Sequence, residues 1–383
     1  MAGIYIHIPF CSSKCAYCDF YSVPALEFKA DYIKALKKEI RLRMPEFRDA
    51  IKNEPVKTIY FGGGTPSALS PKELQEIYTE LANSIDLSNV AEITMEANPD
   101  DLTDEYIKEL TSLDTLHVNR MSIGTQTFND TMLKLFRRRH NAEAATEAVE
   151  RVKRHGITNI SLDLIYAYPE ETTETLSEDI EKLTSLRPTH ISAYQLTYEP
   201  GTTLTKLVKD GKVKPLAENE CVTLYHQLVN TLEQAGYAQY EISNFSLPGY
   251  ESKHNSSYWD MTPYLGLGPS AHSFYSNDRM HNPAALTKYI KLLNDDKIPA
   301  EAEGLTKHEL YNDFIITSLR TRRGIDTEEL RKRFGNTFHD YFMSQLQSRI
   351  QPKLYERCDD GAIRLTQEGI LVSDSVFTEL IWV

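Results

Sequence analysis

Residues 5–22 read YIHIPFCSSKCAYCDFYS, and this stretch decides the fold. It continues an apolar run, Gly3–Ile8, that is typical of a buried strand, and leads directly into the spacing C-x3-C-x2-C at Cys11, Cys15 and Cys18. A closed structural zinc site uses four ligands, so three thiolates leave either a missing ligand elsewhere or an open coordination position. An iron–sulfur cluster suits this shortage, because thiolates hold cubane clusters and an iron without a thiolate can bind a small molecule.

Two alternatives stay open for the cysteine loop. It could be a zinc loop completed by His7 or Asp19, or its cysteines could simply be buried. Two neighbouring features favour the cluster. Tyr17 lies between the second and third cysteines, where an aromatic ring can cover a cluster, and the run GGGTPS at Gly62–Ser67 offers backbone donors to a ligand after the next strand.

Short apolar strands alternate with helical patterns along the first half of the chain. The strands are predicted at Gly3–Ile8, Thr58–Phe61, Glu92–Glu96, His117–Ile123, Asn159–Ile165 and His190–Leu196. A capping box at Ser70 and Glu73 starts one helix, and others are expected after Thr103 and over Asn141–Arg154 and Thr172–Leu186. Six β/α units of this kind predict an α/β fold with a parallel sheet, wound as a barrel or as an open doubly wound sheet.

Three regions are expected along the chain. Residues 1–236 hold the β/α units, residues 237–300 are a loop-rich linker, and residues 301–383 form a C-terminal domain. The last region has helical patterns followed by a strand and a final helix, an order that resembles a winged helix. These elements are predicted at Lys307–Thr321, Thr327–Phe334, Asn336–Ile350, Gly361–Leu365 and Thr366–Leu380.

Composition excludes several classes of protein. Among 383 residues, 42 Lys and Arg stand against 55 Asp and Glu, and the net charge of −13 disfavours binding to nucleic acid or anionic lipid. No run reaches the roughly 18 to 20 apolar residues of a membrane span, although peripheral association through a partner stays open. The first ten residues lack the features of a secretory signal, so a cytoplasmic location is expected. Cys221 and Cys358 are predicted to be buried structural thiols.

Six sequence blocks together point to a family. YIHIPFCSSKCAYCDFYS, IYFGGGTPS, ITMEANPD, RMSIGTQTFND, SLDLIYAYP and AYQLTYEPGT follow one another within residues 5–203. In this combination the chain resembles the radical S-adenosylmethionine (SAM) superfamily and, within it, the HemN/HemW family of anaerobic coproporphyrinogen III oxidases and haem chaperones. The resemblance implies a partial (β/α)6 TIM-like barrel with a HemN-type C-terminal domain. It also implies a 4Fe-4S cluster on Cys11, Cys15 and Cys18, SAM at the open iron, and a reductant such as flavodoxin or ferredoxin.

The resemblance also carries a set of SAM-binding positions. They are Tyr5, Tyr17, Gly63, Gly64, Thr65, Glu96, Gln126, Arg138 and Asp163. Gln126, Arg138 and Asp163 match positions around a second SAM in the oxidases. Each polar residue also has a structural interpretation: Glu96 could cap a helix, Arg138 lies in a basic run, and Asp163 could end a strand in a turn.

Two departures separate this chain from the oxidases of the family. The oxidases carry a further cysteine two residues after the third one, where this chain has Phe20, and they have an additional segment before the first strand. Both differences favour a haem chaperone that passes haem to acceptor proteins. The alternatives are oxygen-independent decarboxylation of coproporphyrinogen III and a radical SAM reaction on another substrate.

A second motif bears on haem. HNSSYW at residues 254–259 resembles the H-N-x-x-Y-W motif of the chaperones, and we predict that His254 ligates haem iron while Tyr258 and Trp259 offer flat faces to the macrocycle. His272 and His281 are the nearby alternatives. In the C-terminal region, Arg320, Arg322 and Arg323 could suggest DNA binding, but the acidity of the chain favours a cover over the barrel mouth or contact with a protein partner.

Overall fold

A large sheet organises the molecule. The computed structural model describes residues 1–52 and 54–383, and its main sheet has the strand order β12-β11-β10-β9-β1-β2-β3-β4-β5-β6-β8-β7. The six central strands pair in parallel, as the β/α pattern predicts. They are β1 (Ala2–Ile8), β2 (Val56–Gly63), β3 (Glu92–Ala97), β4 (Arg120–Gln126), β5 (Ile160–Tyr166) and β6 (His190–Gln195). Within the described residues the sheet stays open, with β12 and β7 at its edges.

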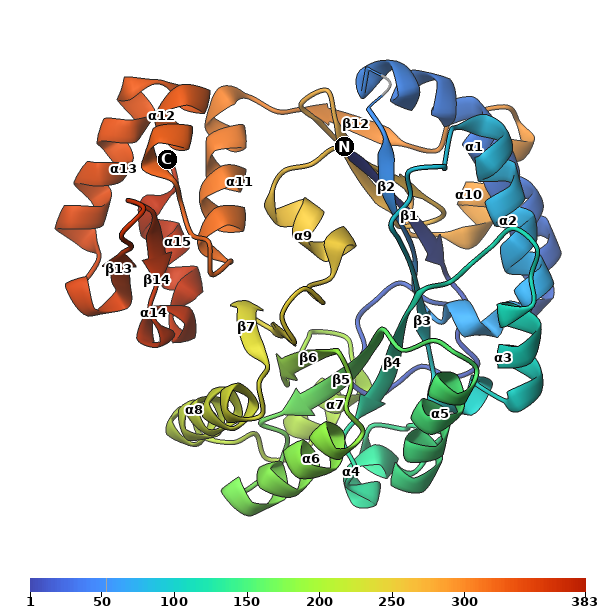
Figure 1. The fold of residues 1–383 in the computed structure, drawn as a ribbon, viewed down its shortest axis with the longest axis horizontal. Coiled ribbons are helices and arrows are strands. Elements are labelled where there is room, and N and C mark those ends of the chain that lie inside the picture. The colour runs from blue at the N-terminus through green and yellow to red at the C-terminus, as the bar shows by residue number, and fades with distance from the viewer. Residues whose placement is uncertain (53) are drawn as a thin grey trace.

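Helices cover the outer face of the sheet (Figure 1). They are α1 (Lys29–Ala50), α2 (Pro71–Ser84), α3 (Asp104–Thr111), α5 (Ala142–Arg154), α6 (Thr173–Ser185) and α8 (Glu218–Gln234). The short helices α4 (Asp130–Leu135) and α7 (Thr203–Lys209) pack beside the cysteine loop, in one apolar cluster with Ala16. The predicted capping box of α2 is present, with the Ser70 side chain accepting from the Glu73 backbone. Neither α4 nor α7 is predicted, because helices of 6 and 7 residues are too short for a clear period of 3.6.

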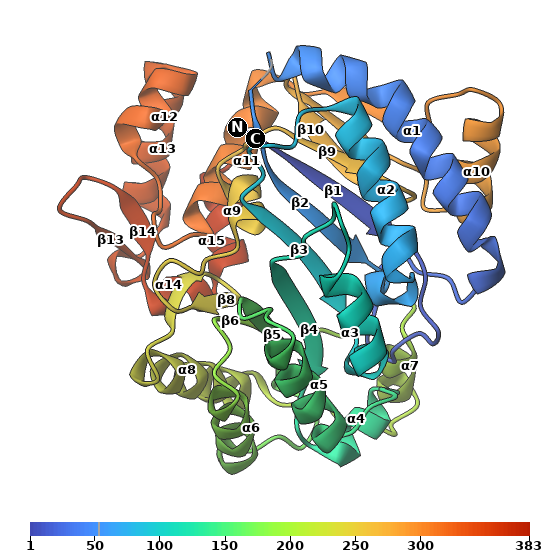
Figure 2. The ribbon, with the colours of Figure 1, turned by 45° about the vertical axis from the view of Figure 1, so that its right-hand side comes forward.

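The linker is more regular than expected. Residues 237–300 hold β7 (Ala238–Glu241), β8 (Asn244–Ser246), α9 (Lys253–Trp259), β9 (Tyr264–Leu267), β10 (His272–Tyr275), β11 (Asp278–His281) and α10 (Leu286–Asn294). Strands β7 and β8 extend the sheet beyond β6, whereas β9 pairs with β1 at the other side. Helix α9 connects β8 to β9 and crosses the inner face of the sheet (Figures 1 and 2). The motif HNSSYW therefore lies in a helix and not in a loop.

The C-terminal region builds a second apolar core. Strand β12 (Glu301–Gly304) still pairs with β11, and the helical part begins after it. It contains α11 (Lys307–Leu319), α12 (Thr327–Phe334), α13 (Asn336–Arg349), the hairpin β13 (Tyr355–Arg357) and β14 (Ile363–Leu365), α14 (Gln367–Leu371) and α15 (Ser373–Leu380). Three helices followed by a hairpin match the predicted winged-helix order. We predicted one final helix, but the structure has two, α14 and α15, because the backbone of Val372 between them is not helical.

Two of the arginines that could suggest DNA binding pair with acidic residues of the preceding region. Arg320 Nε lies 2.8 Å from Glu241 Oε2, and Arg323 Nη2 lies 2.8 Å from Asp260 Oδ1. The Arg320 guanidinium also covers the Trp259 ring at 4.7 Å. These two charges are thus used to join the C-terminal helices to β7 and α9.

Candidate functional site

Backbone hydrogen bonds anchor the cysteine loop. The Cys11 amide donates to Val23 O at 3.1 Å and the Val23 amide to Pro9 O at 2.7 Å, which closes the base of the loop. At its middle, the fully buried Ala16 donates to Phe136 O and accepts from Leu204 N. This anchoring presents the three cysteines, all half-buried, from a loop of defined shape.

A chain of side-chain hydrogen bonds joins two of the cysteines. Cys11 Sγ lies 3.2 Å from Thr65 Oγ1, and Asn98 Nδ2 donates to that hydroxyl at 3.1 Å. Arg138 donates to Asn98 Oδ1 at 2.7 Å and to Cys15 Sγ at 3.2 Å. Arg138 thus donates to one sulfur, and the Thr65 hydroxyl lies within hydrogen-bond distance of the other. The Arg138 side chain is therefore hydrogen-bonded to the cysteine loop and does not extend into solvent as part of a basic run.

The third cysteine and the neighbouring aromatic ring lie deeper. Burial raises the pKa of the Cys18 thiol to about 11, so binding of a metal here displaces a proton. Tyr17 packs edge to face on Phe136, with ring centroids 5.0 Å apart. No three His, Cys, Asp or Glu side chains in the described ranges 1–52 and 54–383 are grouped so that they could hold one metal ion.

The glycine run lies against the base of the cysteine loop. Gly64 donates to Ile8 O at 2.8 Å, and a Cβ atom at Gly64 would lie 2.9 Å from Ile8 O and from Phe10 O. Gly63 has φ of 108° and a Cβ there would meet the His7 ring at 2.6 Å. Only glycine fits this close backbone approach. The run thus forms a cradle beside the cysteines.

Glu96 faces the same cradle. Its carboxylate accepts from Gly63 N at 3.0 Å and from Tyr60 Oη at 2.7 Å. Burial raises the pKa of Glu96, although both hydrogen bonds oppose that shift. The Glu96 carboxylate of β3 thus bonds to two residues of β2 and caps no helix, and these bonds hold it beside the glycine run.

Gln126 ends β4, whereas Asp163 lies in the middle of β5 and not at a turn after it. Gln126 is nearly buried and has φ of 69°, a strained conformation for a side chain other than glycine. Asp163 Oδ1 accepts from Ser122 Oγ at 3.4 Å, and burial followed by the Glu96 charge raises the pKa of Asp163 to about 7. Carboxylates with perturbed pKa values are typical of functional sites. Of the predicted SAM-binding positions, Gly63, Glu96 and Gln126 lie at or next to the C-terminal ends of β2, β3 and β4, whereas Tyr5 and Asp163 lie within β1 and β5.

Asn98 was missed by sequence reasoning, although it lies within the block ITMEANPD two residues after Glu96. We expect Asn98→Ala to weaken retention of a cluster about tenfold or more, because it breaks the link between Thr65 and Arg138 and leaves both without their shared partner. The rate of iron loss to a chelator measures this effect. Asn89→Ala, at an exposed position, is the control. Equal rates of loss in both variants would contradict the expectation.

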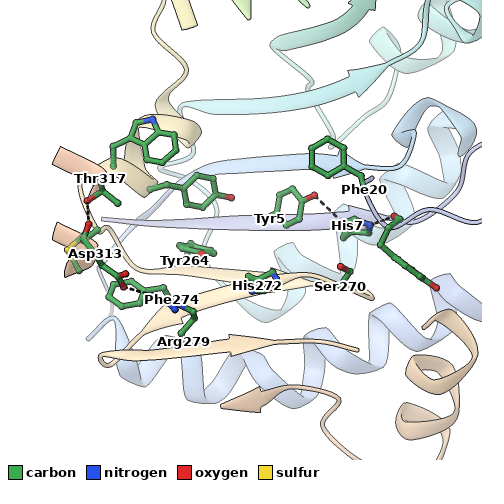
Figure 3. Close-up of a pocket in the computed structure, with 14 residues that line it drawn as sticks. Tyr5, His7, Phe20, Tyr264, Ser270, His272, Phe274, Arg279, Asp313 and Thr317 are labelled. Carbon is green, nitrogen blue, oxygen red and sulfur yellow. Dashed lines mark hydrogen bonds and ion pairs between the residues drawn. The ribbon is translucent and has the colours of Figure 1, made fainter. Parts of the chain in front are cut away.

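A pocket of about 580 Å³ opens beside this region, on the inner face of β1 and β9. Even-numbered residues of β1 such as Ile4 and Ile6 are fully buried in the apolar core, whereas Tyr5 and His7 face the pocket. Aromatic side chains form much of its wall: Tyr5, Phe20, Tyr258, Trp259, Tyr264 and Phe274 (Figure 3). Phe20 stands two residues after Cys18, so the cysteine loop and the pocket adjoin.

The polar groups of the pocket come from different segments. His7, His272, Arg279 and Asp313 line it, and Figure 3 shows the ion pair between Arg279 and Asp313 at its far end. Arg279 Nη2 lies 2.6 Å from Asp313 Oδ2. The pocket is therefore bounded by β1, by the hairpin of β10 and β11, and by α11 of the C-terminal region.

The structure places His254 next to the pocket but not in its lining. His254 is fully buried, its Nδ1 lies 2.8 Å from Thr58 Oγ1, and its Nε2 lies 2.8 Å from Tyr258 Oη. Burial, followed by the Arg120 charge, lowers the pKa of His254 to about 3. Both ring nitrogens are thus hydrogen-bonded, and ligation of iron by His254 requires one of these bonds to break.

The remaining predicted residues are dispersed. His281 is exposed opposite His272 on the hairpin and does not line the pocket. Cys221 and Cys358 are half-buried and lie outside the cysteine loop, so our prediction that they are buried was only partly right. None of the helices described for residues 1–52 and 54–383 combines the length and the apolar character that a membrane crossing needs.

Comparisons with known proteins agree with both parts of this architecture. Residues 5–183 match the radical SAM superfamily, and residues 305–372 match the HemN C-terminal domain. The heme chaperone HemW of Lactococcus lactis is 36% identical over 378 residues, which cover 98% of this chain and 96% of that protein. The heme chaperone HemW of Bacillus subtilis is 33% identical over 382 residues, with 98% of each chain covered.

The solved structure of coproporphyrinogen III oxidase (HemN) from Escherichia coli is similar in fold. It superposes with a TM-score of 0.84 and covers 99% of this chain and 90% of its own, at 22% sequence identity. This likeness extends over the β/α region and the C-terminal helices and concerns the fold alone.

Proposed function

The chain belongs to the HemW family of the radical SAM superfamily, and from this premise we propose that it is a haem chaperone that binds haem and passes it to acceptor proteins. The observation that carries the proposal is the aromatic pocket that adjoins the cysteine loop. Flat aromatic walls suit a macrocycle, and a volume of about 580 Å³ is within the range of ligand pockets.

The radical SAM family implies a 4Fe-4S cluster and SAM. Three thiolates fit a cluster although they do not converge on one ion, because each thiolate of a cubane binds a different iron. In the proposal, Cys11, Cys15 and Cys18 hold the cluster, while the cradle of Gly63 and Gly64 receives the amino acid part of SAM. When bound and reduced, such a cluster supplies an electron for cleavage of SAM. A small redox protein such as flavodoxin or ferredoxin is the proposed reductant.

The neighbouring side chains orient SAM in this proposal. A hydrogen bond from the Tyr60 hydroxyl holds the Glu96 carboxylate toward the cradle. The Arg138 guanidinium, which donates to Cys15, neutralises negative charge on the cysteine loop. Tyr17, between two cysteines, covers the loop from the side of Phe136. Gln126 at the end of β4 and Asp163 within β5 extend the polar surface, where a nucleoside has hydrogen-bonding partners.

Haem occupies the aromatic pocket in the proposal, with Tyr258 and Trp259 of HNSSYW in its wall. Anaerobic titration of the reconstituted protein with haem, followed by Soret absorption, tests this idea. We expect saturation at one haem per chain and transfer of that haem to a haem-free acceptor protein on mixing. Absorption that rises without saturation would contradict the proposal.

The same sample tests the alternative of a decarboxylating enzyme. Incubation with coproporphyrinogen III, SAM and a reductant is expected to leave the substrate unchanged, because Phe20 stands at the position of the further cysteine of the oxidases. Formation of protoporphyrinogen would assign the chain to the oxidases instead.

A further inference from the structure

Three imidazoles lie in or next to the aromatic pocket, and two of them are fully engaged. His7 Nε2 lies 2.9 Å from Tyr21 O and its Nδ1 lies 3.2 Å from Tyr5 Oη. His254 uses both nitrogens on Thr58 and Tyr258. An imidazole needs a free nitrogen lone pair to bind a metal. Neither ring offers one without rearrangement of the pocket wall.

His272 differs from both. Its side chain is exposed, lines the pocket, and makes no hydrogen bond within the residues that the structure describes. Partial burial, followed by the charges of His281 and Arg279, lowers the pKa of His272, which favours the neutral ring with a free lone pair. In Figure 3 it lies on the floor of the pocket, between Tyr264 and Ser270.

The sheet fixes the direction of His272. Residues of a strand alternate between its faces, so His272 and Phe274 face the pocket while Ser273 and Tyr275 point the other way. Ser273 is buried and its hydroxyl accepts from Gly266 N at 2.9 Å and from Arg43 at 3.0 Å. This bonding on the opposite face keeps the imidazole directed at the cavity.

The face of the hairpin that carries His272 also carries a cation, the guanidinium of Arg279. Arg279 stands opposite Phe274 in the ladder, about 7 Å along the strand from His272. In the structure the Arg279 guanidinium forms an ion pair with Asp313. A carboxylate of a ligand carries the same chemical group as Asp313, so it can accept hydrogen bonds from Arg279 in the same way. A flat ligand with a metal at its centre and carboxylates at one edge matches this arrangement, with the metal at the His272 imidazole and the carboxylates at the Arg279 guanidinium.

We propose that His272 is the axial ligand of the iron when haem occupies this pocket, with the haem carboxylates toward Arg279; this assignment rests on the proposed function. His254 is then a positioning residue, which holds the Tyr258 phenol so that the ring packs on Tyr264, with centroids 4.6 Å apart. Its substitution loosens the aromatic wall and leaves the iron ligand in place.

Ferric haem titrations of four proteins test the assignment: the parent, His272→Ala, His254→Ala and the control His117→Ala, which removes an exposed histidine outside the pocket lining. Soret absorption gives the affinity, and electron paramagnetic resonance gives the iron ligand. We expect His272→Ala to lose the imidazole signature and at least about tenfold in affinity. Free imidazole should restore the signature, and His117→Ala should behave as the parent.

The outcomes separate the two proposals. His272→Ala with the parent's imidazole signature would overturn the ligand assignment alone, and loss of the signature in His254→Ala would move the ligand to that residue. A parent protein without saturable haem binding would overturn the proposed function and the assignment with it. Circular dichroism and cluster content, measured on every variant, show that each one is folded. His272→Gln serves as a second variant if the alanine variant fails this check.

Discussion

Replacement of Cys15 by alanine is expected to abolish the iron–sulfur cluster that anaerobic reconstitution builds in the parent protein. Three thiolates are the only ligands that this loop offers to a cluster in the proposal, and Cys15 is also the sulfur to which Arg138 donates at 3.2 Å. Removal of one thiolate leaves two, which is too few to retain a cubane against free thiols in solution. Iron and sulfide analysis, with visible absorption, measures the loss.

The chain supplies matched controls for this experiment. Cys221→Ala and Cys358→Ala remove half-buried cysteines outside the loop, so both variants should reconstitute as the parent does. Full iron content in Cys15→Ala would contradict the cluster assignment. Zinc bound to the anaerobically prepared parent, with no uptake of iron and sulfide, would favour the zinc interpretation of the loop.

The sequence was sufficient to predict the elements that are local. The parallel strands β1 to β6 follow from short apolar runs separated by helical patterns, and the start of α2 follows from Ser70 and Glu73. The cysteine loop could be predicted because its chemistry lies within eight consecutive residues. Such features depend on neighbours in the sequence, which spacing reveals directly.

The pocket could not be predicted from the sequence, because it depends on contacts between distant segments. Tyr5 comes from β1, Tyr264 from β9 and Asp313 from α11, and only the pairing of β1 with β9 brings the first two together. The hydrogen bond between Thr58 and His254 joins residues 196 apart in the chain. Resemblance identified the motif around His254, but the hydrogen bonds of its ring follow from tertiary structure alone.

A buried ion pair behind the pocket links the fold to the proposed function. Glu39 and Arg43 of α1 are 0% and 1% exposed, and their charged groups lie 3.1 Å apart. Arg43 donates to Gly266 O and to Ser273, while Glu39 accepts from the Gly268 amide at 2.8 Å. The pair therefore holds β9 and β10 from behind, and the opposite face of these strands carries Tyr264 and His272.

Glu39→Ala is expected to lower the free energy of unfolding by about 3–5 kcal/mol, because it leaves the Arg43 charge buried without its partner. The variant also removes the acceptor for Tyr289 and Asn282, which donate to the carboxylate at 2.6 Å and 2.7 Å. Urea unfolding of the parent and the variant measures the difference from the shift in midpoint. Glu76→Ala, which breaks the exposed pair with Lys37, is the control and should cost at most about 1 kcal/mol.

The same substitution tests whether the strands behind the pocket set its haem affinity. Gly268 then loses its acceptor, and Arg43, which donates to Ser273, loses the carboxylate that holds it in place. The direction of His272 is less firmly held, so haem should bind more weakly to folded Glu39→Ala than to Glu76→Ala. Cluster content should stay equal, because no hydrogen bond joins Glu39 to the cysteine loop in the described part of the chain. Strong destabilisation with unchanged haem affinity would show that haem binds elsewhere than on the face of β9 and β10.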